Sequence, residues 1–242
     1  MIKFEHTEVV GWEHAIRGMR NPYSIEGAEN NSWDKSDSNY GCEEGKCDNC
    51  EVTGDFFDLP GCDYRNYVVG PNDHDLMIRL AKGGPVHAKY RRMITVYVTI
   101  TAPLYWWKEF DTYKVGTVAN SCSTMHKIHA KEFTLEDFSC EHLVDEDFEA
   151  YNPNIMIQKI VNCLNECRSK YLETKDKKYW WQMIQLLPSS YNQKRTVMLN
   201  YEVLANIYKW RKDHRLDEWR EFCKWIEGLP YSEIITGKEC EV

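Results

Sequence analysis

The chain of 242 residues lacks an apolar run of membrane-spanning length, and its N-terminus lacks the layout of a signal peptide. It also lacks an excess of positive charge, because 38 Asp and Glu outnumber 30 Lys and Arg and give a formal net charge of -8. This balance argues against a nucleic-acid backbone or an anionic membrane as the main partner. We therefore expect a cytoplasmic protein with neither kind of partner.

Internal repeats and low-complexity tracts are missing as well. The hydrophobic content of 43% is ordinary and is enough for a core. The 9 Trp and 15 Tyr suit a core, subunit contacts or stacked planar ligands. We expect residues 1–242 to form a single domain that is interrupted at residues 30–72 by a Cys-rich polar insertion, which has little hydrophobic periodicity.

The insertion contains a C-x4-C-x2-C motif with a further cysteine downstream. Closely spaced thiolates bind zinc or iron-sulfur clusters, and the short distance to the last cysteine favours zinc. Free thiols in a loop are the alternative, and most of the ten cysteines are interpreted as reduced thiols. The candidate metal ligands are Cys42, Cys47, Cys50 and Cys62.

The central segment predicts a strand followed by a helix and a polar loop. Residues 94–101 alternate between β-branched apolar residues and Thr or Tyr, which is typical of a half-buried strand. Pro103 suits the first turn of a helix over residues 103–113. Residues 116–124 then gather hydroxyl, amide and thiol groups, which indicates either a ligand loop or an ordinary polar turn.

Hydrophobic periodicity predicts most of the other elements. We expect an opening helix to about Met19, a strand at residues 196–199 and a helix that Asn200 caps. The fold class is therefore α+β, with a central sheet flanked by helices. Cys163 and Cys167 lie one turn apart on a predicted helix and are expected to be buried there. The remaining helices are predicted at residues 73–82, from 153, at 177–187 and at 217–227.

A predicted helix ends in the Leu187-Pro188 pair, and a later helix opens with Asn200 and carries Asn206 and Arg211. These motifs resemble those of the flavin-dependent thymidylate synthases. The resemblance covers roughly residues 73–128 and 155–228. The matching residues are His87, Ala102, Pro103, Leu187, Pro188, Asn200, Leu204, Asn206 and Arg211.

The chain also departs from that family. Thr112, Tyr113 and Lys114 stand where the family has its Arg-His-Arg signature, and Cys122 stands where it has a serine. Glu202 replaces an Arg that follows the first Asn. The resemblance therefore points to a divergent member.

The resemblance implies FAD-dependent reductive methylation of dUMP at C5, or a related C5 modification, in a homotetramer with shared active sites. NADPH and methylenetetrahydrofolate would be co-substrates. Arg211 is the catalytic candidate that this resemblance gives. Cys122 is a catalytic candidate under a separate hypothesis, as a thiolate that attacks the pyrimidine ring in the way of the classical, flavin-independent thymidylate synthases. The cofactor-binding candidates are His87, Lys114, Asn120, Asn200 and Asn206. The substrate-binding candidates are Asn120, Ser121, Cys122, Ser123 and Arg211.

Three other interpretations remain open. The chain could modify a related nucleotide, as in a virus or phage with modified DNA. It could have lost catalysis and serve as a nucleotide-binding or assembly protein. It could also be an interaction protein that is stabilised by a metal in the Cys-rich insertion.

Overall fold

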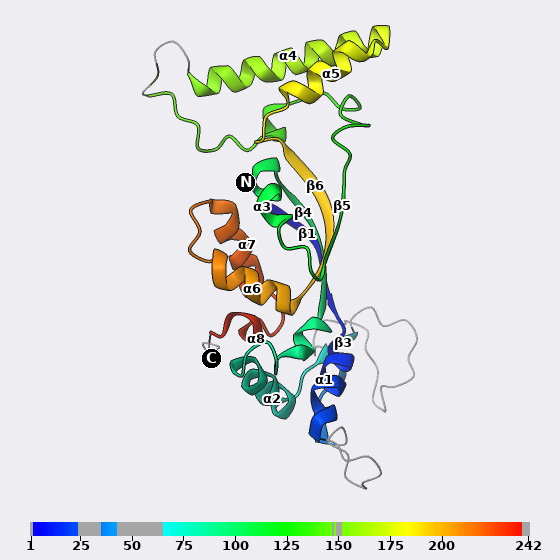
Figure 1. Ribbon diagram of the computed structural model, residues 1–242, viewed down its shortest axis with the longest axis vertical. Helices are drawn as coiled ribbons and strands as arrows, with labels where there is room; N and C mark the ends of the chain where they lie inside the picture. Colours follow the sequence, from blue (N-terminus) through cyan, green and yellow to red (C-terminus); the bar gives the residue numbers. More distant parts are fainter. Residues whose placement is uncertain (1, 24–34, 43–64, 147, 149–151, 239–242) are drawn as a thin grey trace.

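The computed structural model describes residues 2–23, 35–42, 65–146, 148 and 152–238. A four-stranded antiparallel sheet joins a helical hairpin at one end of the molecule to a group of helices at the other (Figure 1). The strand order is β1-β4-β6-β5. These strands are β1 (Lys3–Val10), β4 (Thr95–Pro103), β6 (Asn192–Asn200) and β5 (Thr117–Ser121).

The alternation predicted for the central strand is present. Val96, Val98 and Ile100 of β4 are fully buried, whereas the residues between them are more exposed. On the less buried face, the hydroxyl oxygens of Thr99 and Thr196 lie 3.2 Å apart across the β4–β6 pair. The sheet is therefore one-sided, as is common for antiparallel sheets.

Helices cover the buried face of the sheet and continue into the larger core. Helices α3 (Leu104–Phe110), α6 (Tyr201–Arg211) and α7 (Asp217–Glu227) lie beside it (Figure 1). Large aromatic side chains fill the space between them, which explains part of the high Trp content. The most buried of these are Trp106, Trp107, Phe110, Tyr201, Trp219 and Phe222.

The same core extends to the end of the molecule opposite the hairpin. It is completed by α1 (Trp12–Arg20), α2 (Pro71–Lys82), the 3-10 helix η4 (Lys89–Arg92) and α8 (Glu233–Thr236). A smaller two-stranded sheet pairs β2 (Asn39–Cys42) with β3 (Arg65–Val68). A short 3-10 helix, η1 (Asn21–Tyr23), follows α1.

The hairpin of α4 (Pro153–Thr174) and α5 (Lys177–Leu186) has a separate small core. The Asn152 side chain caps α4 by accepting hydrogen bonds from the backbone N–H groups of the second and third helical residues. A capping box between Thr134 and Asp137 is present at the 3-10 helix η5 (Leu135–Asp137). Cys163 is exposed and Cys167 is half-buried, so the prediction that both are buried was wrong for Cys163.

Two other predictions need correction. The opening segment forms strand β1 before helix α1 begins at Trp12, so the predicted helix is correct only from there. Gly11 makes the change of direction with φ of 95°, and a Cβ at this position would lie 2.2 Å from the Met93 carbonyl oxygen. The predicted polar loop contains an edge strand, β5, because its residues pair with β6.

The predicted metal ligands fall largely outside the described residues. Cys47, Cys50 and Cys62 lie there, and only the backbone of Cys42 is described, as the last residue of β2. Within the described ranges, no group of three or more potential metal-ligating side chains gathers. The zinc hypothesis therefore stays a prediction.

No helix in the described ranges is long and apolar enough to span a bilayer.

Candidate functional site

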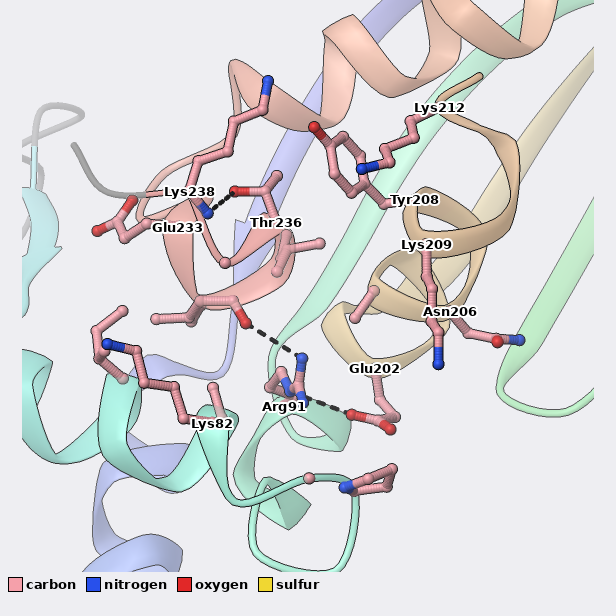
Figure 2. Close-up of a pocket in the computed structure, with 18 of the residues that line it drawn as sticks. Lys82, Arg91, Glu202, Asn206, Tyr208, Lys209, Lys212, Glu233, Thr236 and Lys238 are labelled. Atoms are coloured by element: carbon pink, nitrogen blue, oxygen red, sulfur yellow. Dashed lines mark hydrogen bonds and ion pairs between the residues drawn. The ribbon is translucent and has the colours of Figure 1, made fainter. Parts of the chain in front are cut away.

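A cavity of about 690 Å³ lies between α2, η4, α6 and α8 (Figure 2). Its volume is within the usual range for small-molecule and cofactor pockets. Ile78, Ala81, Ala205 and Ile235 provide apolar wall, and polar side chains surround them. We call this cavity the α6 pocket, because six of its lining residues come from α6 and the residue that follows it.

Positive charge dominates the lining of the α6 pocket. The lining includes five Lys and Arg side chains against two carboxylates, although the whole protein carries a net charge of -8. Lys82, Lys209 and Lys212 are exposed and form no ion pair with any carboxylate in the described ranges. Lys238 is paired, since its Nζ lies 2.7 Å from Glu227, and this hydrogen bond raises the pKa of Lys238.

The wall of the pocket holds a buried ion pair. The Nε atom of Arg91 lies 3.1 Å from Oε2 of Glu202, and the two side chains are 9% and 20% exposed. Arg91 also donates a hydrogen bond of 3.2 Å from Nη1 to the Ile234 carbonyl of α8. The facing atoms, Nε and Oε2, are buried and make no hydrogen bond of acceptable geometry in the described part of the chain.

Of the predicted cofactor-binding positions, the pocket lining includes one, and a second lies close to a lining segment in the sequence. Asn206 lines it directly. His87 is exposed and follows the turn of Gly84 and Pro85, which also line the pocket. The backbone N–H of His87 donates to the Gly84 carbonyl at 3.0 Å. The third of these positions, Asn200, caps α6 as predicted, because its side-chain oxygen accepts from the Val203 N–H at 3.0 Å.

Replacement of Asn200 tests whether the cap is its main role. We expect Asn200→Ala to lower the free energy of unfolding by about 1 kcal/mol, because one N–H at the start of α6 loses its acceptor. Asn200→Asp keeps an acceptor oxygen and is expected to stay near wild type. Urea denaturation of both variants measures the difference. Equal losses in the two variants would show that the side-chain amide, and not the cap, matters.

Arg211 is held away from the α6 pocket by contacts with α3 and α7. Its Nη1 donates to Oε2 of Glu109 at 2.7 Å, and its Nε donates to the Tyr113 hydroxyl at 3.0 Å. The guanidinium also lies over the Trp219 ring, 4.6 Å from its centroid. Glu109 is therefore the carboxylate partner of Arg211.

The polar residues on and after β5 lie in a different place. Lys114 and the run 120–123 are exposed, and Ser121 is opposite Arg195 in β6. Arg195 precedes Asn200 by five residues, or about 16 Å of strand. In the described ranges, Asn120, Ser121, Cys122 and Ser123 neither line the α6 pocket nor hydrogen-bond to Arg211. A single chain therefore does not gather all of the predicted substrate-binding residues.

Sequence reasoning missed most of the cations of the α6 pocket. Lys82, Arg91, Lys212 and Lys238 come from four separate segments, so their convergence depends on the tertiary fold. One signal was available along α6. Glu202, Asn206 and Lys209 are spaced by four and three residues, which places polar groups on one helix face.

Comparison with known proteins identifies the fold. Neither family models nor curated proteins match the chain by sequence. Two solved structures of thymidylate synthase X from Helicobacter pylori, both with FAD and dUMP, are similar to it. The first has a TM-score of 0.60 at 15% identity, and the aligned region covers 98% of this chain and 96% of the Helicobacter pylori chain. The second has a TM-score of 0.57 at 13% identity and covers 99% and 98%. The chain has the thymidylate synthase X fold.

Proposed function

We propose that this chain is a thymidylate-synthase-like protein that binds a flavin nucleotide in the α6 pocket and modifies C5 of dUMP or a related pyrimidine nucleotide. The observation that carries the proposal is the excess of positive charge in a nucleotide-sized pocket of an acidic protein. The fold supports it, because two solved structures that match this chain over nearly its whole length contain FAD and dUMP.

The residues of the α6 pocket fit a flavin nucleotide. Lys82, Lys209 and Lys212 provide cations for phosphate groups, and Asn206 provides an amide. The buried atoms of the Arg91–Glu202 pair have unused hydrogen-bonding capacity in the wall. FAD is therefore the proposed cofactor, with His87, Asn200 and Asn206 as its proposed contacts. The other two predicted cofactor contacts, Lys114 and Asn120, do not line this pocket.

When bound, the flavin supplies a hydride, with NADPH as its reductant and methylenetetrahydrofolate as the carbon donor. The protein's part is to hold the nucleotides, orient them and exclude water. The proposed substrate site combines Arg211 of one subunit with Asn120, Ser121, Cys122 and Ser123 of another in a homotetramer. A shared site of this kind would unite residues that lie apart within one chain.

A lysine variant tests the pocket. We expect Lys82→Ala/Lys209→Ala to weaken the binding of FAD by about tenfold or more, because two cations that face the phosphates are lost. Titration followed by flavin fluorescence measures the dissociation constant. Lys159→Ala on α4, which removes an exposed lysine outside the pocket, is the matched control. If the control and the double variant bind FAD equally, the flavin is not in this pocket.

The second candidate is a nucleotide-binding protein without catalysis. The clamp of Glu109 and Tyr113 on Arg211 favours it, because a guanidinium held in this way is not free to bind a substrate. The two functions differ in a direct assay. An enzyme consumes dUMP with FAD, NADPH and methylenetetrahydrofolate, whereas a binding protein gives a thermal shift with dUMP but no product. Zinc quantification tests the separate metal hypothesis for the Cys-rich insertion.

A further inference from the structure

The Arg91–Glu202 pair is the least expected part of the α6 pocket. Burying two charges costs several kcal/mol per ion, and good geometry is needed to offset that cost. Here the facing Nε and Oε2 atoms lie 3.1 Å apart without a hydrogen bond. Stability alone is a poor reason for such a pair, so contact with a ligand is the better explanation.

The exposed part of Glu202 faces the cavity. Its Oε2 atom is buried against Arg91, whereas the side chain as a whole is 20% exposed and lines the pocket. The exposure therefore belongs to the rest of the side chain, which includes Oε1. Figure 2 shows the two side chains meeting between α6 and η4. The site thus offers an acceptor, Glu202, beside a donor, Arg91.

An acceptor beside a donor is complementary to an imide edge, in which a ring N–H is flanked by carbonyl groups. Glu202 can accept from the N–H, while Arg91 donates to a neighbouring carbonyl. The isoalloxazine ring of a flavin and the uracil ring of a nucleotide both carry this edge at N3. Cytosine does not, because its N3 has no hydrogen. A carboxylate accepts an N–H but cannot donate to a bare ring nitrogen.

The spacing along α6 suits a whole nucleotide. Glu202, Lys209 and Lys212 all line the pocket. At 1.5 Å per residue, Lys209 is about 10 Å and Lys212 about 15 Å farther along the helix axis than Glu202. A ring held at Glu202 would therefore place its phosphates within reach of the lysines.

We propose that Glu202 is a specificity-determining residue that reads the imide N–H of the ring bound in the α6 pocket, and that Arg91 positions its carboxylate. This inference rests on the proposed function, because it requires that a nucleotide binds here. It goes beyond that function because it assigns which edge of the bound ring the protein recognises. It also gives Glu202 a role of its own at a position where the resemblance led us to expect an Arg.

Paired ligands test this inference. Dissociation constants are measured for FMN against 3-methyl-FMN, and for dUMP against 3-methyl-dUMP and dCMP. The pocket binds either the flavins or the pyrimidine nucleotides. In whichever series binds there, we expect the dissociation constant from the wild-type protein to be at least tenfold lower for the ligand with the free N3–H. A preference within the flavin pair assigns the pocket to the isoalloxazine, and one within the uracil series assigns it to the pyrimidine nucleotide.

Two variants separate recognition from folding. Glu202→Gln keeps an acceptor but loses the charge, so the preference should fall by about fivefold. Arg91→Met/Glu202→Met replaces the pair with apolar side chains, which is often tolerated by the fold, and should abolish the preference. Glu166→Gln on the exposed face of α4 is the control. If FMN or dUMP binds but methylation at N3 has no effect, the inference is wrong. If neither binds, the proposed function fails with it.

Discussion

Asp73→Ala is expected to lower the free energy of unfolding by about 3–5 kcal/mol, because it removes one partner of a buried ion pair. Asp73 lies in the first turn of α2 and is fully buried. Its Oδ1 accepts from Arg20 Nε at 2.5 Å, and its Oδ2 accepts from the hydroxyls of Ser36 and Ser38, each at 2.6 Å. The carboxylate thereby joins α1, α2 and residues 35–38.

The same helix provides a matched control. Asp75 is exposed and pairs with Arg79 one turn away, and exposed pairs of this kind contribute at most about 1 kcal/mol. Urea denaturation of Asp73→Ala and Asp75→Ala should therefore show a difference of several kcal/mol. If the two losses are similar, Asp73 does not make the contacts described. Asp73→Asn keeps the shape but not the charge, and should fall between them.

The Asp73 contacts also predict a dependence on pH. Burial raises the pKa of this carboxyl, but the hydrogen bonds from Ser36, Ser38 and Arg20 outweigh it, so the pKa lies below the usual value of 3.8. A carboxyl whose pKa is lower in the folded state than in the unfolded chain stabilises the folded protein at pH values above its unfolded-state pKa. This stabilisation is lost as the pH falls through its folded-state pKa. The difference in the free energy of unfolding between wild type and Asp73→Ala should therefore become smaller below about pH 4.

The sequence predicted those elements whose pattern is local. The alternation in β4 and the cap at Asn200 depend on neighbouring residues, and the structure contains both. Strands β1 and β5 were missed for a physical reason. Most of their residues are exposed, so neither segment has the apolar alternation that marks a half-buried strand. Only pairing with β4 and β6 defines them.

In the candidate site, too, the sequence predicted single residues but not the contacts that depend on the tertiary fold. The resemblance singled out Asn206, which lines the α6 pocket, and Arg211, which pairs with Glu109. It could not reveal that Arg91, from η4, pairs with Glu202, from α6. These residues are more than a hundred positions apart in the chain, and only the packing of the core brings them together.

The second large effect is expected from the adjacent tryptophans of α3. Trp106 and Trp107 are both fully buried and pack edge to face, with ring centroids 4.9 Å apart. Trp106→Ala should lower the free energy of unfolding by about 3–5 kcal/mol, because it leaves a large cavity beside Trp219 and Phe222. Urea denaturation measures this loss.

Replacement by Phe distinguishes the two residues. The indole N–H of Trp107 donates to the Gln193 carbonyl at 2.9 Å, whereas that of Trp106 is buried with no hydrogen-bond partner among the described residues. Both Phe variants lose a similar amount of buried surface. Trp107→Phe also leaves a carbonyl without its donor, which costs about 1–3 kcal/mol, while Trp106→Phe removes an unsatisfied group. We therefore expect Trp107→Phe to be the less stable variant by about that amount. Equal stabilities would mean that the indole N–H of Trp106 also has a hydrogen-bond partner. A further polar group would then lie next to α3 in the protein core.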